Sequence, residues 1–255
     1  MKQYAPGKEP QFSREDDKLN PAEIEVKGGF IGWLDNFWFY HKWKVIVIAA
    51  ALLLFIICAA QMCSNVSDDL TFMYSGSAYL TTVPNYEQMI SKFAEVMPGD
   101  YNGDGQKLVE CAAMNIYSQE QIEARKEAVA KGEAVAEYNT YINTQEYTSF
   151  NRLIQTGEYS LCLIEKWLYD GIADGVFCKL SDTLGYQPEY AIDNYSVYFW
   201  DTEFAKANAE VFAAIPKETV LCLRMKNSLT GKGSEEQYKR AKETFIAIFS
   251  FKVEE

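Results

Sequence analysis

An uncharged apolar stretch from Val45 to Cys63 constrains this chain more than any other feature of its sequence. Its nineteen residues would span about 28 Å as a helix, which matches the hydrocarbon core of a bilayer. A buried core helix seldom stays apolar on all its faces for so long, and a signal peptide has a short basic start, whereas 44 residues precede this stretch. We therefore predict a transmembrane helix over residues 45–63.

The charged residues on either side of the stretch indicate its orientation. Lys42 and Lys44 come directly before it, whereas Asp68 and Asp69 follow it with no Lys or Arg nearby. Basic residues favour the cytoplasmic side of a membrane. We therefore predict a single-pass protein of the cell membrane, with a cytoplasmic N-terminus and a C-terminal domain outside the cell.

The sequence before the predicted span is rich in aromatic residues. Residues 30–44, FIGWLDNFWFYHKWK, contain four large amphipathic rings that suit the depth of the lipid headgroups. They predict an interfacial segment that contacts the bilayer through Trp33, Trp38, Tyr40 and Trp43. Residues 1–29 carry mixed charges with few large apolar side chains, and predict a disordered cytoplasmic tail.

Charge and histidine content limit the function of the outer part. Acidic and basic residues balance in residues 1–44, so the net charge of −12 falls on the rest of the chain and opposes nucleic-acid binding. The single histidine, His41, precedes the predicted span, which excludes a histidine-based triad or zinc site outside the membrane. A hydrolase with two carboxylates stays open, but we expect a protein that is not an enzyme.

Four cysteines follow the span, at positions 111, 162, 178 and 222. Their even number permits two disulfides in three connectivities. Three of them lie in apolar runs, where a free cysteine behaves as a small buried side chain. Disulfides and free thiols both remain open as interpretations, and the apolar runs favour free thiols.

Beyond a spacer at residues 64–69, the hydrophobic pattern predicts one domain over residues 70–255. Short apolar runs predict strands near residues 70–74, 107–116, 159–164, 196–200 and 219–225. Between them, capping residues and periodic apolar positions predict helices that begin after Asn85, Ser118, Asp201 and Ser234, with others near residues 144–155 and 165–172. This alternation is typical of an α/β domain with a mostly parallel sheet and flanking helices.

The order of these segments resembles a known family. The succession LTFMYSGS, NYEQMISKFAEVM, DYNGDGQ, KLVECAAMNI, FNRLIQTGEYSLCLIEKWLYD and CKLSD, over residues 70–226, resembles one lobe of the type-2 extracellular solute-binding proteins of bacterial transporters. With the aromatic segment of residues 30–44 before a single span, the chain looks like the single-span membrane-anchored proteins of Gram-positive anaerobes. The resemblance implies a solute or a transporter subunit as partner. A complete protein of that family has two lobes around a cleft.

An open parallel sheet binds ligands beyond the carboxyl ends of its strands. The positions that follow the first and third predicted strands are Ser75, Gly76, Ser77, Glu165, Lys166 and Trp167. We predict that these residues form a ligand site, where the indole could stack on a sugar ring. The alternative for Trp167 is a partly buried packing residue.

The loop DYNGDGQ resembles the start of a calcium-binding loop. Asp100, Asn102 and Asp104 stand at alternate positions before Gly105, so their oxygens could converge on Ca²⁺. The second half departs from the pattern, because Cys111 stands where a bidentate glutamate belongs. The alternative is a polar turn before a strand.

Two functions follow from these predictions. The first is binding outside the cell, without catalysis, of a solute or of a membrane partner such as a transporter subunit. The alternative is a structural or interaction protein of the cell envelope that has lost its ligand site. A deep pocket lined by Trp167 and residues 75–77 would favour the first, and a closed strand edge beside an exposed apolar patch would favour the second.

Overall fold

The structure of the protein is a computed structural model that describes residues 29–64, 68–133, 138–172, 175–226 and 232–252. The chain divides into two compact units, residues 1–65 and residues 66–255, which are described separately. The predicted disordered tail falls almost entirely outside the described residues.

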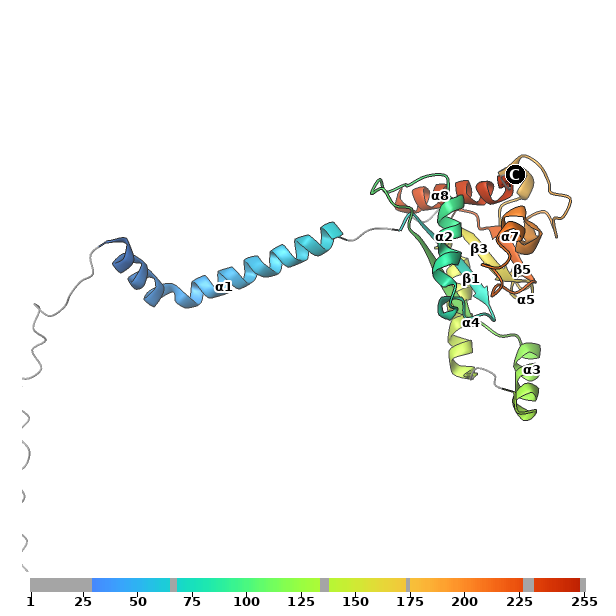
Figure 1. Cartoon of the computed structure of the whole chain (residues 1–255), viewed down its shortest axis with the longest axis horizontal. Helices are drawn as coiled ribbons and strands as arrows, with labels where there is room; N and C mark the ends of the chain where they lie inside the picture. The colour runs from blue at the N-terminus through green and yellow to red at the C-terminus, as the bar shows by residue number, and fades with distance from the viewer. Residues whose placement is uncertain (1–28, 65–67, 134–137, 173–174, 227–231, 253–255) are drawn as a thin grey trace, which may run out of the picture. The chain divides into compact units, whose positions relative to one another are not determined.

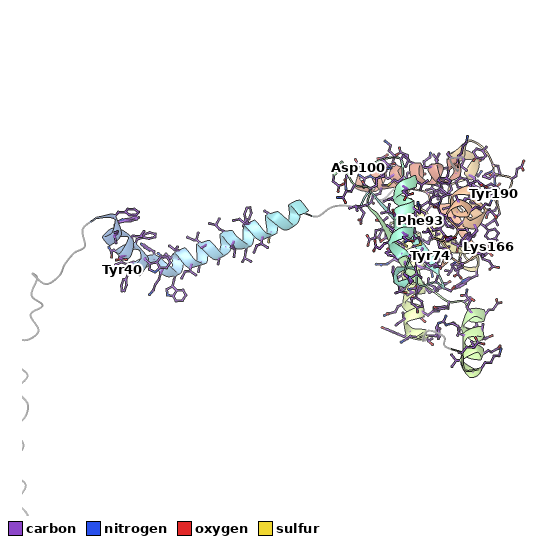
Figure 2. The ribbon with its side chains drawn as sticks, viewed as in Figure 1. Tyr40, Tyr74, Phe93, Asp100, Lys166 and Tyr190 are labelled. Atoms are coloured by element: carbon purple, nitrogen blue, oxygen red, sulfur yellow. The ribbon has the colours of Figure 1, made fainter. Side chains whose placement is uncertain are left out.

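The first unit contains one long helix, α1 (Phe30–Ser64). Its apolar part is long enough to cross a membrane or to serve as a signal sequence. The aromatic segment and the predicted span belong to this one helix, so no break separates them at Val45. The rings at positions 33, 38, 40 and 43 are exposed, and Figure 2 shows Tyr40 extending from the helix.

The second unit is built on one five-stranded sheet with the strand order β2-β1-β3-β5-β4. The strand β1 pairs in parallel with β2 and β3, whereas β5 runs antiparallel to both β3 and β4. Four strands therefore share one direction, which confirms the predicted α/β class with a mostly parallel sheet. The strands are β1 (Leu70–Gly76), β2 (Val109–Asn115), β3 (Leu161–Glu165), β4 (Ser196–Tyr198) and β5 (Thr219–Leu223).

Helices cover both faces of the sheet because successive strand side chains point to opposite faces. In β1, Phe72 and Tyr74 face a core with α2 and α8, while Met73 faces a second core with α4. Phe93 of α2 packs against Phe72, with the ring planes tilted by 31° and 4.4 Å between the ring centroids. The helices are α2 (Tyr86–Val96), α3 (Gln119–Ala130), α4 (Thr140–Thr156), α5 (Lys166–Tyr169), α6 (Leu180–Leu184), α7 (Glu203–Ala207) and α8 (Lys232–Ser250).

The predicted helix starts are right in part. Ser118 and Gln121 form the expected capping box of α3. Asn85 does not cap α2 through its side chain, because its amide donates to the carbonyl of Val211. Asp201 lies inside a short 3₁₀ turn, and Thr202 caps α7 instead, because its hydroxyl oxygen accepts from the backbone N–H of Ala205 at 3.2 Å.

The cysteines of the domain are free thiols in the structure, which is the reading that the apolar runs favoured. Cys111, Cys162 and Cys222 are buried, and Cys178 is half-buried. Cys162 and Cys222 stand opposite each other on the antiparallel strands β3 and β5. Both therefore contribute to the core as small apolar side chains.

Candidate functional site

The carboxyl ends of β1 and β3 form the edge at which an α/β sheet of this kind would bind a ligand. From β1 the chain passes to β2 on one side and later to β3 on the other, so the strand order reverses between β1 and β3. Ligands of open α/β sheets bind at such a reversal. Four of the predicted residues gather here: Gly76 ends β1 and Ser77 follows it, Glu165 ends β3, and Trp167 lies in α5.

The carboxylate of Glu165 is the centre of this edge. Its side chain is buried, with 3% of its surface exposed. Its Oε1 accepts hydrogen bonds from the backbone N–H of Ser77 at 2.5 Å and from the hydroxyl of Ser77 at 2.6 Å. Its Oε2 accepts from Nε2 of Gln121 at 2.9 Å and from the indole Nε1 of Trp167 at 3.1 Å. Four donors of the chain therefore hold this carboxylate, which we call the Glu165 cluster.

The capping box of α3 positions one of these donors. The side-chain oxygen of Gln121 accepts from the backbone N–H of Ser118 at 2.9 Å, which leaves the NH₂ group free to reach Glu165. We did not predict Gln121 as part of the edge. The signal was present, because a glutamine at this capping position always retains an unused donor.

Close packing leaves little space around the Glu165 cluster. A Cβ at Gly76 would lie 2.6 Å from Oε1 of Glu165 and 2.7 Å from the hydroxyl of Tyr74. That hydroxyl accepts from the backbone N–H of Ala78 at 3.1 Å. Burial, and then the charge of Glu165, raise the pKa of Tyr74 well above its usual range. The tyrosine therefore stays neutral and completes a closed edge.

The remaining two predicted residues are placed differently. Ser75 is fully buried, and within the part of the chain that the structure describes its hydroxyl has no hydrogen-bond partner. Lys166 forms an ion pair with Asp170 of the same turn at the surface. The structure therefore brings Gly76, Ser77, Glu165 and Trp167 together, but not Ser75 and Lys166.

A small aromatic cavity of about 60 Å³ lies beside this edge, at the end of β2. Asn143 of α4 fixes one wall, because its side chain accepts from the N–H of Tyr117 at 2.8 Å and donates to the carbonyl of Tyr117 at 3.2 Å. Burial, and then a hydrogen bond with Tyr79, raise the pKa of Tyr117 to about 12. The cavity is lined by Tyr79, Asn115, Tyr117, Tyr138, Asn139, Ile142 and Asn143.

Exposed apolar side chains surround this cavity. Ile142 lines it with 50% of its surface exposed, and Tyr79 lines it with 37% exposed. Tyr141, next to Ile142 in the first turn of α4, is 69% exposed. We call Tyr79, Tyr138 and Ile142, which line the cavity, the aromatic surface. Figure 1 shows that this end of α4, together with α3, extends away from the sheet.

The predicted calcium loop is held by its own backbone. Asp100 accepts from the N–H groups of Gly103 and Gly105, each at 2.7 Å, and the bond from Gly105 is the main cause of the lowered pKa of Asp100. Asn102 and Asp104 accept from backbone N–H groups two residues ahead, at 2.9 and 2.8 Å. These contacts are those of a polar turn. Calcium binding stays a prediction, since a carboxylate oxygen that accepts one N–H keeps a second lone pair with which it could bind a metal.

The predicted spacer is in part a structural element. Asp69 is 2% exposed, and its carboxylate accepts from the N–H groups of Tyr101, Asn102 and Leu108 at 2.7–3.0 Å. It therefore joins the start of β1 to the loop after α2. The prediction of a spacer up to residue 69 is wrong at this position. The residues that donate to Asp69 lie more than 30 positions later in the chain, and no local pattern predicts that they contact it.

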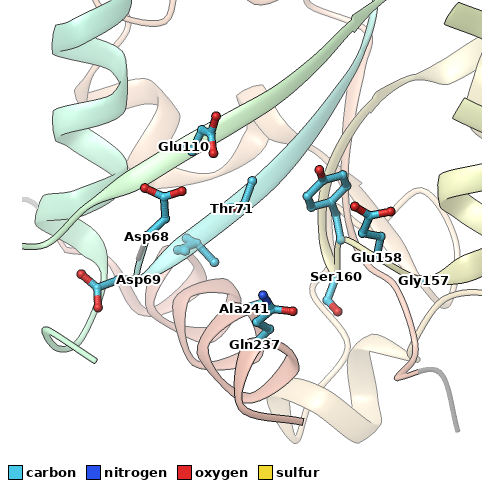
Figure 3. A pocket seen from close by; sticks show the side chains of 11 residues that line it. Asp68, Asp69, Thr71, Glu110, Gly157, Glu158, Ser160, Gln237 and Ala241 are labelled. Carbon is cyan, nitrogen blue, oxygen red and sulfur yellow. The ribbon is translucent and has the colours of Figure 1, made fainter. Parts of the chain in front are cut away.

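A second cavity, of about 240 Å³, lies at the opposite end of the sheet, where β1, β2 and β3 begin (Figure 3). Four acidic residues line it, namely Asp68, Asp69, Glu110 and Glu158. A hydrogen bond that the protonated Glu110 donates to Asp68, and then burial, raise the pKa of Glu110. Among the described residues, no three His, Cys, Asp or Glu side chains gather closely enough to hold a metal ion.

Comparisons of the chain with models of protein families, with curated proteins and with solved structures give no match. No relative therefore supplies a function for the Glu165 cluster or for the cavities. The contacts of the described residues carry the functional argument.

Proposed function

We propose that the chain is a membrane-anchored protein without catalytic activity, whose α/β domain lies outside the cell and binds a protein partner through the aromatic surface. The apolar helix α1 supports the anchor, and Lys42 and Lys44 before the predicted span support a cytoplasmic N-terminus. The partner is another membrane or envelope protein, such as a transporter subunit.

One observation carries the choice of a protein partner over a solute at the strand edge. Each oxygen of Glu165 accepts two hydrogen bonds from the chain itself. The groups of Ser77 and Trp167 that would hold a solute are therefore engaged. A solute would have to break these bonds, and an unsatisfied buried donor costs about 1–3 kcal/mol.

The size and chemistry of the neighbouring surface support the same proposal. Small-molecule pockets usually measure about 300–1,000 Å³, whereas the aromatic cavity has about 60 Å³, which is enough for one side chain of a partner. Tyrosine is enriched at protein interfaces, because a rigid ring buries a large area and its hydroxyl can still form a hydrogen bond.

A photo-cross-linking experiment in intact membranes tests this proposal. A photoreactive amino acid replaces Ile142, which is 50% exposed on the aromatic surface, or Tyr186, which is 52% exposed after α6. The two positions are matched in exposure and differ in place. We expect a discrete adduct with another protein from position 142 and none from position 186.

Two results would contradict the proposal. One is the same set of adducts from both positions, or no protein adduct from position 142. The other is a rise of the melting temperature of the full chain in nanodiscs with one of a panel of sugars and oligopeptides, abolished by Trp167→Phe. That second result would support solute binding at the strand edge as the function.

A further inference from the structure

A cavity of about 310 Å³ lies between α6, α8 and the residues after β5. It is separate from the aromatic surface and from the Glu165 cluster, which are lined by other residues. It shares Gly175, Phe177 and Tyr195 with an adjoining cavity of about 240 Å³, so the two form one groove. This volume reaches the lower limit of ordinary small-molecule sites.

The floor of this groove is apolar and aromatic. Phe177 is buried there and stacks on Tyr169 at 5.3 Å between ring centroids. Tyr238 of α8 forms one wall, and its hydroxyl lies 3.3 Å from the thiol of Cys178. Met225, after β5, is partly exposed at the rim. A flat apolar ligand body would therefore find ring faces and a flexible thioether around it.

Two lysines bring positive charge to the part of the groove beside α6 and α8. Lys242 stands one helical turn after Tyr238 on α8, so both lie on one face of the helix. Lys179, at the start of α6, lines the groove from the other side. Within the described residues neither lysine forms an ion pair. Three carboxylates line the groove, and each has a partner within the chain. Asp182 accepts from Ser181 and Asp170 pairs with Lys166, whereas Asp193 accepts from the hydroxyl of Tyr169, the N–H of Tyr195 and the hydroxyl of Ser196.

We propose that this groove binds a small organic anion with an apolar body, such as an aryl-substituted carboxylate. The apolar part would lie on Phe177 and Tyr238, and the carboxylate would pair with Lys242 and Lys179. A chain with a net charge of −12 repels anions elsewhere on its surface, so two unpaired ammonium groups beside an apolar floor select this class of ligand. The proposal stands independently of the aromatic surface and its partner.

Three probe ligands separate the charge from the apolar body. The full chain in nanodiscs is titrated calorimetrically with 4-phenylbutyrate, with its neutral isostere 4-phenylbutanamide and with acetate, and the heats of empty nanodiscs are subtracted. We expect binding of 4-phenylbutyrate, binding of the amide that is at least about tenfold weaker, and no measurable binding of acetate, because both halves of the ligand are needed.

Variants at the groove test the residues. Lys242→Gln and Lys179→Gln should each weaken binding of 4-phenylbutyrate about tenfold, because each removes one charge-assisted contact. Lys206→Gln is the control, since Lys206 pairs with Glu203 on α7 outside the groove, and it should leave the affinity unchanged. Thermal unfolding identifies a variant that fails to fold. If Lys242→Gln fails to fold, Lys179→Gln still tests the proposal, because Lys179 is exposed.

Three outcomes would overturn the proposal. They are no heat with millimolar 4-phenylbutyrate, equal affinity for the acid and the amide, and unchanged affinity in both folded lysine variants.

Discussion

The two ends of the parallel strands use their glutamates in opposite ways. At the carboxyl end, Glu165 is buried and accepts four hydrogen bonds from its own chain. At the amino end, Glu110 and Glu158 line an open cavity, and Glu158 is exposed to solvent. The same residue type is therefore part of the framework at one end and part of the surface at the other.

This difference shows that the position of a polar residue at a strand end does not decide its role. A carboxylate whose oxygens are satisfied internally stabilises the fold, because burying it without partners would be costly. A carboxylate that faces solvent remains available for interaction and contributes little to stability. The following predictions break or sharpen this comparison, and they begin with the largest expected effect.

Replacing the buried carboxylate should destabilise the domain strongly. Glu165→Ala leaves the donors of Ser77, Gln121 and Trp167 without an acceptor, and we expect a loss of about 3–5 kcal/mol in the free energy of unfolding. Glu158→Ala at the opposite end is the matched control, with an expected change within about 0.5 kcal/mol. Urea unfolding followed by tryptophan fluorescence measures both. Equal losses in the two variants would remove the distinction between the two ends.

A methyl group at the closed edge should be less costly. In Gly76→Ala the new Cβ would lie within 2.6–2.7 Å of Glu165 and Tyr74, so we expect a loss of about 1–3 kcal/mol through overpacking. Gly99→Ala is the control, since a Cβ there meets no atom within 4 Å. Thermal unfolding should show a lower melting temperature for the first variant alone. A Gly76→Ala variant as stable as the wild type would mean that the edge has room.

The smallest expected effect lies at the open end and depends on pH. The pKa of Glu110 is raised above its ordinary value of 4.5, so the folded state binds this proton more tightly than the unfolded state does. The stabilisation is present below pH 4.5 and is lost as the pH rises through the raised pKa. Glu110→Gln, which keeps a neutral group, should therefore be more stable than the wild type at pH 7 and equally stable at pH 4. The gain should stay below about 1 kcal/mol because the side chain is exposed. The same difference at both pH values would contradict this assignment.

Local patterns predicted most of the fold. Strand runs and helical periodicity identified the sheet and the helices, and Ser118 with Gln121 identified the start of α3. The parallel arrangement also predicted that Ser77, Glu165 and Trp167 would meet. These predictions succeed because each depends on a few neighbouring residues or on one rule of topology.

The sequence could not show how the gathered groups would pair. Glu165 and Ser77 are 88 positions apart, and only the packed structure shows that they bond to each other. The sequence alone predicts a spacer at Asp69, because its hydrogen-bond partners, at positions 101, 102 and 108, follow an intervening helix. The groove beside Lys242 also joins α6, α8 and the end of β5, and no local pattern predicts such a meeting.

Hydrogen exchange at the end of β1 tests the central claim, that the strand edge is closed by the Glu165 cluster. The claim predicts that the backbone N–H of Ser77, which donates to Glu165, exchanges as slowly as the amides inside β1 in the full chain in nanodiscs. In Glu165→Ala the same N–H should exchange faster than those core amides. Exchange of the Ser77 N–H at the rate of an exposed loop in the wild-type chain would contradict the claim, because the edge would then be open to a solute.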